Sequence, residues 1–117
     1  MLKEKVMTTN SSLPKDAPPT IDLRQREIRH AAGARYKLSR LELALLSCLL
    51  GHAGHPVSRG ELLAGVWRLD PLRTMTRTVD MHISMLRKKL GDNSRAPSLL
   101  VTVYGVGYMM RPVTTTA

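Results

Sequence analysis

The chain has 117 residues, of which 43% are hydrophobic, so it is long enough for one domain with a core and too apolar for wholesale disorder. Aromatic residues make up only 3% and phenylalanine is absent, which leaves Leu, Val, Ile and Met to build the core. A formal charge of +9 favours a polyanionic partner, most often a nucleic acid, with an anionic membrane as the lesser option.

The N-terminal part of the chain predicts an arm followed by short strands. Residues 1–19 are polar and contain three prolines, which is typical of a flexible arm or linker. The alternation in Ile21–Leu23, Glu27–His30 and Arg35–Leu38 predicts three strands, with a glycine-containing turn at Ala31–Ala34. Together these segments predict a small antiparallel meander.

Two helices are predicted next, and each begins with a capping box, in which a serine and a glutamate three residues later satisfy each other's backbone N–H groups. Ser39 and Glu42 form the first box, ahead of a helix that is apolar on most sides and ends at Gly51. Ser58 and Glu61 form the second, ahead of a short helix through Trp67. An extended link, Pro56-Val57, precedes the second box, and residues 68–75 predict a loop.

A third helix is predicted from Thr76, as N-cap, to Leu90, with Gly91 as C-cap. One stripe at helical spacing is apolar and predicts the buried side: Val79, Ile83, Leu86 and Leu90. A second stripe lies about 200° round the helix and faces away from the core: Arg77, Met81, Ser84 and Lys88. The segment 73–90 carries a net charge of +4, so this outward face is basic.

The C-terminal part predicts a hairpin, because Leu99–Val103 and Tyr108–Arg111 flank a Gly-x-Gly turn. Two capped helices, a basic helix and a hairpin make a winged helix-turn-helix. The predicted fold is therefore α+β, with three helices, a small N-terminal antiparallel sheet and a C-terminal hairpin wing. A helix fits the DNA major groove, and a thin glycine-rich wing can approach a minor groove or a phosphate. Residues 20–112 are predicted to form this domain and residues 113–117 a disordered tail.

Five segments carry a resemblance to a known family: LSRLE at 38–42, VSR at 57–59 followed by ELL at 61–63, RTVDMHI at 77–83, LRKKL at 86–90 and TVYGVGY at 102–108. In this order and with near-matching spacing, they resemble the DNA-binding effector domain of OmpR/PhoB-type response regulators over about residues 20–112. The resemblance implies sequence-specific DNA binding in transcription regulation within a two-component system. It places helix 76–90 in the major groove and wing 102–108 at the adjacent minor groove or backbone.

The resemblance also implies a set of DNA-binding residues. Phosphate contacts are expected from Arg77, Thr78 and His82, and contacts with base edges from Met81, Ser84, Met85 and Lys88. Trp67 and Tyr108 are expected to reach the backbone as well as to pack, and Arg87, Thr102 and Tyr104 complete the set. The implied partners are promoter direct repeats, bound by a head-to-tail pair of domains, and RNA polymerase, contacted through loop 68–75.

The sequence departs from the family pattern in three ways. Ser84 and Met85 stand where basic residues are common, and Tyr104 stands at a wing position where Arg is common. Methionine can contact a thymine methyl but cannot grip guanine in a bidentate way, so we expect few guanines to be read directly and affinity to depend on phosphates and DNA shape. About twenty residues precede the first strand, too few for a receiver domain, which leaves an excised effector domain or a stand-alone regulator open.

Other chemistry finds little support in the sequence. Cys48, His52 and His55 lie within eight residues, but a zinc site needs a fourth ligand and Cys48 belongs to a buried stripe. We expect no metal, no cofactor and no catalytic residue, and hence no enzyme. Asp80 is the one acid on the basic helix and is expected to pair with Arg59.

The runner-up interpretation is a winged-helix module that binds a protein, such as polymerase or a partner regulator, with weak non-specific DNA affinity. A steep loss of affinity with salt would distinguish DNA binding from this alternative. An RNA duplex fits poorly, because its major groove is too deep and narrow for a helix. No apolar run reaches the ~18 residues of a membrane span, no secretory signal is evident, and the single cysteine fits a reducing compartment. We therefore expect a cytoplasmic domain with no membrane partner.

Overall fold

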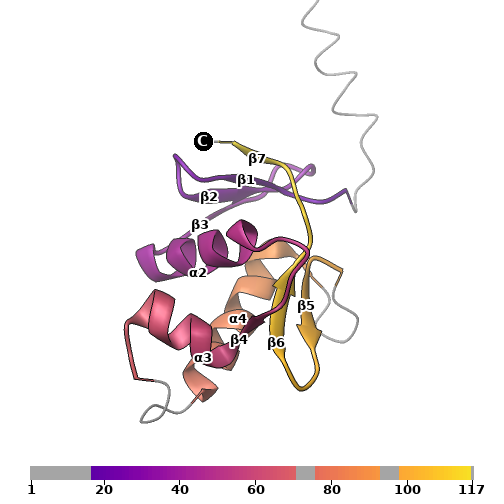
Figure 1. Ribbon diagram of the computed structural model, residues 1–117. Coiled ribbons are helices and arrows are strands. Elements are labelled where there is room, and N and C mark those ends of the chain that lie inside the picture. Colours follow the sequence, from indigo (N-terminus) through magenta and orange to yellow (C-terminus); the bar gives the residue numbers. More distant parts are fainter. Residues whose placement is uncertain (1–16, 71–75, 93–97, 117) are drawn as a thin grey trace, which may run out of the picture. The chain divides into compact units, whose positions relative to one another are not determined.

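The computed structural model describes residues 17–70, 76–92 and 98–116 and divides them into two compact units (Figure 1). The first, here called the sheet unit, extends to Lys37 and includes the chain from Val113 onward. The second, the helical unit, is Leu38–Pro112. Most of the predicted arm, residues 1–16, and residues 71–75 of the predicted loop lie outside the described residues. The boundaries 20–112 of a single domain stay a prediction.

The sheet unit contains the predicted meander. Its strands are β1 (Thr20–Asp22), β2 (Glu27–Arg29), β3 (Arg35–Lys37) and β7 (Thr115–Thr116), in the order β3-β2-β1-β7. The pairs β1–β2 and β2–β3 are antiparallel, and the buried Ile21 faces the buried Ile28 across the first pair.

Strand β7 differs from the sequence-based expectation of a disordered tail at 113–117. Thr115–Thr116 pairs in parallel with β1, and the backbone N–H groups of Ile21 and Leu23 donate to Thr114 O and Thr116 O at 3.0 and 2.8 Å. The physical reason is that β1 has a second edge whose N–H groups need acceptors. A two-residue strand shows no alternation in its own sequence, so the local pattern cannot predict it.

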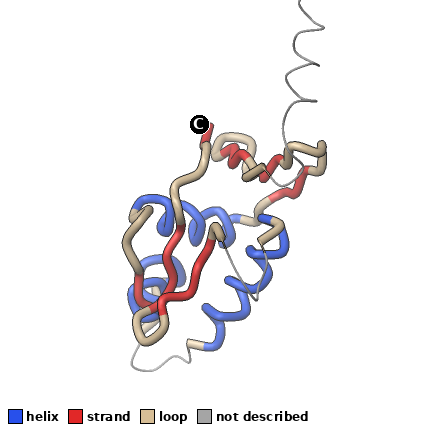
Figure 2. The backbone as a smooth tube through the Cα atoms, turned by 90° about the vertical axis from the view of Figure 1, so that its right-hand side faces the viewer, coloured by secondary structure: helices blue, strands red, loops and turns tan. Residues whose placement is uncertain are grey.

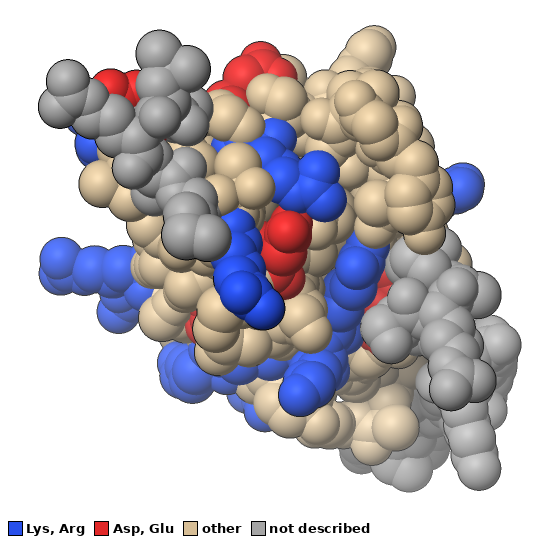
Figure 3. All heavy atoms as spheres, turned by 90° about the horizontal axis from the view of Figure 1, so that it is seen from below, with Lys and Arg blue, Asp and Glu red and all other residues tan. Residues whose placement is uncertain are grey.

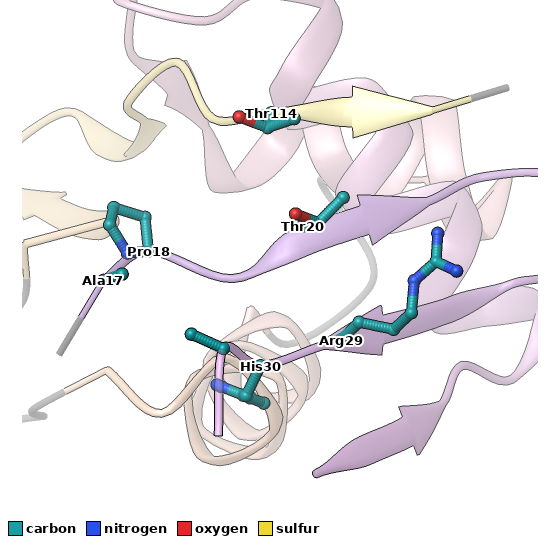
Figure 4. A pocket seen from close by; sticks show the side chains of 7 residues that line it. Ala17, Pro18, Thr20, Arg29, His30 and Thr114 are labelled. Carbon is teal, nitrogen blue, oxygen red and sulfur yellow. The ribbon is translucent and has the colours of Figure 1, made fainter. Parts of the chain in front are cut away.

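A hollow in the sheet unit is lined by residues from β1 and β2, from the segments that precede β1 and follow β2, and from the segment before β7 (Figure 4). Thr20, Arg29, His30 and Thr114 contribute its polar groups. The Arg29 guanidinium already donates to the Asp22 carboxylate at 2.8 Å. The hollow therefore has its main charge engaged within the unit, and none of its residues belongs to the predicted DNA-binding set.

The helical unit has the element order of a winged helix (Figures 1 and 2). Its elements are α2 (Arg40–Gly51), β4 (Val57–Ser58), α3 (Arg59–Leu62), the π-helical turn η1 (Leu63–Trp67), α4 (Arg77–Leu90), β5 (Leu100–Val103) and β6 (Gly107–Met110). Strands β4, β6 and β5 form an antiparallel sheet in that order. The buried apolar side chains of this unit come from every helix and from the sheet.

Both predicted capping boxes are confirmed. In the first, Glu42 N donates to Ser39 Oγ at 3.1 Å and Ser39 N donates to Glu42 Oε1 at 2.7 Å. In the second, the corresponding distances between Ser58 and Glu61 are 3.0 and 2.9 Å. Each box satisfies donors that would otherwise be unpaired at a helix start.

The helix boundaries differ from the predictions in two places. The predicted helix through Trp67 is α3 followed by the π-helical turn η1, which ends at Trp67; the next residue, Arg68, has a left-handed backbone with φ 58°. Helix α4 begins where expected, but the Thr76 side chain makes no capping hydrogen bond; its carbonyl instead accepts from Val79 N at 3.0 Å. At the other end, the predicted C-cap Gly91 is confirmed, with φ 72°.

Glu42 also joins two helices, because Lys89 Nζ on α4 donates to its Oε1 at 2.7 Å. Burial by itself would raise the pKa of this carboxyl, but hydrogen bonds from Lys89 and Ser39 and the Lys89 charge together lower it. The folded state therefore holds Glu42 ionised to lower pH than the unfolded chain does.

We expect Glu42→Gln to reduce the free energy of unfolding by about 2 kcal/mol at pH 7, since it removes a charge-assisted hydrogen bond from a buried position. A carboxyl with a lowered pKa stabilises the fold above its unfolded pKa, and this contribution disappears as pH falls through the folded value. The difference in stability between the variant and the parent should therefore shrink as pH falls below the unfolded pKa of about 4.3. Urea unfolding from pH 3 to 7 measures this; a constant difference over the range would contradict it.

Candidate nucleic-acid interface

Helix α4 divides into a buried and an exposed side, as the sequence predicts. The predicted stripe is confirmed as buried, each member being at most 1% exposed: Val79, Ile83, Leu86 and Leu90. The other side is exposed and contains two cations, a serine and two methionines: Arg77, Met81, Ser84, Met85 and Lys88. Met81 and Met85 are 58% and 49% exposed, which is unusual for large apolar side chains. We call this side of α4 the outer face.

Cations gather on the part of the helical unit that contains α4 and the hairpin. Figure 3 shows the surface seen from below in Figure 1, where α3, α4 and the β5–β6 turn end, and Lys and Arg side chains lie around a smaller acidic patch. Helix α4 contributes four cations against one acid, Asp80. A surface with this excess of positive charge attracts a polyanion. The negative charge of Asp80 opposes that attraction unless cations of the protein compensate it.

The charge of Asp80 is compensated by hydrogen bonds within the protein, and the predicted pair with Arg59 is confirmed. Arg59 Nε on α3 donates to Asp80 Oδ1 at 2.7 Å, and Tyr108 Oη on β6 donates to the same oxygen at 2.5 Å. Burial by itself would raise the pKa of Asp80, but hydrogen bonds from Tyr108 and Arg59 and the Arg59 charge together lower it. Asp80 is therefore ionised at neutral pH and fixes α4 against α3 and the sheet.

Arg87 ties α4 to the wing strand β5. Its Nε donates to Leu100 O at 2.9 Å and its Nη2 to Thr102 Oγ1 at 2.8 Å. The guanidinium groups of Arg87 and Arg59 also lie 5.6 and 5.1 Å from the centre of the Tyr108 ring, within the range of cation–π attraction. The outer face of α4 and the wing are thus held in a fixed relative position.

The wing ends in a three-residue loop, Tyr104 to Val106, between β5 and β6. Val106 N donates to Val103 O at 2.9 Å, and Gly105 has φ 79°, the value of the third residue of a type II turn. Tyr104, which precedes this glycine, is 90% exposed, and Val106 is 47% exposed. The tip therefore presents an aromatic and an aliphatic side chain to the surroundings.

Trp67 and His82 form a half-buried pair beside the outer face. Their rings meet edge to face, with centroids 5.2 Å apart. His82 Nδ1 lies 2.8 Å from the carbonyl oxygen of Thr78, one turn earlier in α4, and donates to it in the matching tautomer. This bond directs the other ring nitrogen, Nε2, away from the helix backbone.

The structure places the predicted DNA-binding residues on η1, α4 and the β5–β6 hairpin of the helical unit, at three depths of burial. Arg77, Met81, Ser84, Met85, Lys88 and Tyr104 are exposed, and Trp67, Thr78, His82, Arg87 and Thr102 are half-buried. Tyr108 is buried at 5% exposure, and its hydroxyl is engaged with Asp80. Tyr108 packs, as expected from the sequence, but sequence reasoning missed the hydrogen bonds by which Tyr108 and Arg87 join α4 to the hairpin. In the sequence, Tyr108 is an aromatic residue in a strand and Arg87 a cation in a helix. Both patterns are the same whether the side chain contacts DNA or holds α4 against the hairpin.

The residues weighed as a metal site do not gather into one. Among residues 17–70, 76–92 and 98–116, no group of three His, Cys, Asp or Glu side chains could hold a metal ion. His52 Nδ1 is instead 2.9 Å from Cys48 O within α2. Burial, followed by the charge of Glu61, raises the pKa of the Cys48 thiol. Within the same described ranges, no helix is long and apolar enough to cross a membrane.

A helix with an exposed basic face, tied to a glycine-turn hairpin, defines a winged-helix domain of the DNA-binding class. Comparison with known families gives the particular one: the profile described as "Transcriptional regulatory protein, C terminal" matches residues 33–110. The chain belongs to this family of regulator C-terminal domains, and its solved relatives are of the OmpR/PhoB type. This is a family of transcriptional regulators and not of enzymes.

Among sequence relatives, the chain is 41% identical over 96 residues to the probable transcriptional regulator ycf27 of Guillardia theta, covering 81% of this chain and 37% of that protein. It is 42% identical over 78 residues to the transcriptional regulator RpaA of Synechocystis sp., covering 67% and 32%. The chain thus spans less than half the length of these curated relatives.

Among solved structures, the RstA DNA-binding domain of Klebsiella pneumoniae, in complex with the RstA box, matches with a TM-score of 0.71 and 35% identity. That match covers 83% of this chain and 94% of the RstA domain. The response regulator DrrB of Thermotoga maritima, an OmpR/PhoB homologue, matches with a TM-score of 0.60 and 30% identity, covering 74% and 42%. These matches confirm the predicted winged-helix fold and the predicted family.

Proposed function

We propose that this domain binds specific duplex DNA sites to regulate transcription, with α4 in the major groove and the β5–β6 wing at the adjacent minor groove or backbone. The observation that carries the proposal is the outer face of α4. The opposite side of α4 is buried and anchors the helix in the core. The outer face takes no part in that packing and can enter a groove. A helix of 14 residues, about 21 Å long, fits the major groove, which is about 12 Å wide.

The chemistry of the outer face supports a division of labour along α4. Arg77 lies in the first turn, next to Thr78 and His82, and these residues would bind phosphates. Met81, Ser84, Met85 and Lys88 lie on the outer face and would face base edges. An apolar pair of methionines favours thymine methyl groups over guanine, so the preferred sites would be rich in A·T pairs at these positions.

We further propose partners and a compartment that rest on family membership. Two copies would bind direct repeats head to tail, about 10 bp apart. Loop 68–75 would contact RNA polymerase; of its described residues, Leu69 is 41% exposed. A DNA-binding regulator of this kind would act in the cytoplasm, where the single Cys48 stays reduced.

Selection of bound duplexes from a random library, followed by sequencing, tests the proposed function. We expect a motif repeated at about one helical turn, and affinity that falls steeply between 50 and 200 mM salt. Binding that is weak and indifferent to sequence at low salt would contradict it. That result would favour the alternative interpretation, a winged-helix module that binds a protein.

Substituting Met85 with Ala should change base preference at one or two positions of the selected motif, because Met85 is half exposed on the outer face and contributes no charge. We expect weaker selection for thymine there and an unchanged salt dependence. Repeating the library selection with the variant measures this. Tyr36→Ala, which removes an apolar side chain of 43% exposure from β3, is the matched control. An identical motif from the Met85 variant would contradict the assignment.

A further inference from the structure

The wing differs from the rest of the basic surface in having no charge. Residues 99–110, which contain both wing strands and their turn, include no Lys, Arg, Asp or Glu. The chain as a whole carries a net charge of +9. A phosphate contact through a cation is therefore not available to the wing tip, and electrostatic attraction to the DNA backbone must come from other elements.

The wing tip exposes apolar surface that the fold does not use. Tyr104 is 90% exposed and Val106 is 47% exposed, although both residue types are usually buried at least in part. The turn between them is tight and hydrogen-bonded, with Gly105 at φ 79°. The two side chains thus lie at the end of a narrow, rigid projection.

The tip has a fixed position relative to the outer face of α4. Arg87 joins α4 to β5 through Leu100 O and Thr102 Oγ1, and Tyr108 joins β6 to α4 through Asp80. When α4 occupies a major groove, the hairpin that is bonded to α4 would bring the tip beside the same duplex. This continuity with the interface favours DNA over a separate protein as the occupant.

We propose that Tyr104 and Val106 form an apolar wedge that enters the minor groove, partly unstacks one base step and bends the duplex. This inference rests on the proposed function, since α4 must first bind the major groove. Apolar side chains inserted from the minor groove unstack a step and bend DNA toward the major groove. The cost is lowest at pyrimidine–purine steps such as TA and CA/TG. The wedge would therefore select a flexible step without hydrogen-bonding to its bases.

The test uses the full chain and the duplex obtained by library selection. Dissociation constants are measured at three salt concentrations for the parent, Tyr104→Ala, Tyr104→Phe and Arg77→Ala. The bend is followed by energy transfer between dyes at the duplex ends. Unstacking is followed by the fluorescence of 2-aminopurine placed in turn at each position flanking the motif.

We expect Tyr104→Ala to weaken binding about ten-fold at every salt concentration, with an unchanged salt slope, a smaller bend and loss of the 2-aminopurine signal. Tyr104→Phe keeps the ring and should behave like the parent. Arg77→Ala should instead lower the salt slope by about one and leave the bend in place.

Two results would overturn the wedge while leaving the proposed function intact. In the first, Tyr104→Ala keeps the affinity, bend and fluorescence of the parent while Arg77→Ala weakens binding; the tip then faces something other than DNA, such as a protein. In the second, Tyr104→Phe weakens binding as much as Tyr104→Ala and neither variant changes the bend, which indicates that the Tyr104 hydroxyl contacts the DNA backbone. If the parent itself selects no motif, the proposed function fails. Unfolding curves that superimpose for all variants exclude a loss of fold as the cause.

Discussion

Replacing Gly107 with Ala should destabilise the helical unit by about 3 kcal/mol, because the backbones of β4 and β6 approach too closely to admit a methyl group. A Cβ at this position would lie 2.0 Å from Val57 O and 2.7 Å from Ser58 Cα. Backbone atoms cannot turn aside as a flexible side chain does, so the two strands must separate. Urea unfolding followed by circular dichroism measures the loss.

Gly65→Ala in η1 is the matched control, because a Cβ there meets nothing within 4 Å and the residue has no positive φ. This change should leave stability unchanged or raise it by up to about 1 kcal/mol. Equal stability of the Gly107 variant and the parent would show that β4 and β6 tolerate a wider spacing. Because Tyr108 follows Gly107 in β6, the Gly107 variant should also lose DNA affinity through displacement of the interface.

Replacing Arg77 and Lys88 together with Ala should weaken specific DNA binding about 100-fold at physiological salt. These exposed cations lie eleven residues apart, about 16 Å along α4, so the pair acts at both ends of the outer face. Arg77 would release a counterion from a phosphate, and Lys88 would contact a base edge, each contributing on the order of 1–2 kcal/mol. Fluorescence anisotropy with the selected duplex and with a scrambled one measures both affinity and specificity.

Arg40→Ala provides the control for net charge. Arg40 is an exposed cation at the start of α2, and its loss changes the total charge without touching α4. The control should bind within about two-fold of the parent at 150 mM salt, where distant charges are screened. An Arg40 variant that matches the effect of a single α4 substitution would show that total charge, and not the outer face, determines binding. The salt slope of the double variant should fall by one to two.

The helices of this protein were predictable because their signals are local. A capping box connects residues three apart, so Ser39 with Glu42 and Ser58 with Glu61 mark two helix starts in any context that permits a helix. The stripe from Val79 to Leu90 repeats at the helical period, which fixes the buried side of α4 and hence its outer face. The hairpin follows from strand-forming runs on both sides of a glycine turn. These signals identify the fold and most of the surface proposed to bind DNA.

The tertiary structure decided the features that depend on partners distant in the sequence. Strand β7 exists because β1 has a free edge, and β4 exists because β6 pairs with Val57–Ser58; neither segment is long enough to show a pattern of its own. The sequence pattern of Tyr108 is the same as that of a surface aromatic residue. Its role in the interior depends on Asp80 and Arg59, which lie beside it only in the folded protein.

The sequence by itself therefore determined the elements, their order, the family and the side of α4 that faces outward. Only the tertiary structure decided which of the predicted residues form the surface and which hold it from within. Arg87 and Tyr108 belong to the second group, while Tyr104 belongs to the first. The physical reason is that periodicity records the burial of a residue within its own element. The hydrogen-bond partners of a cation or a tyrosine are set by elements that meet it only after folding.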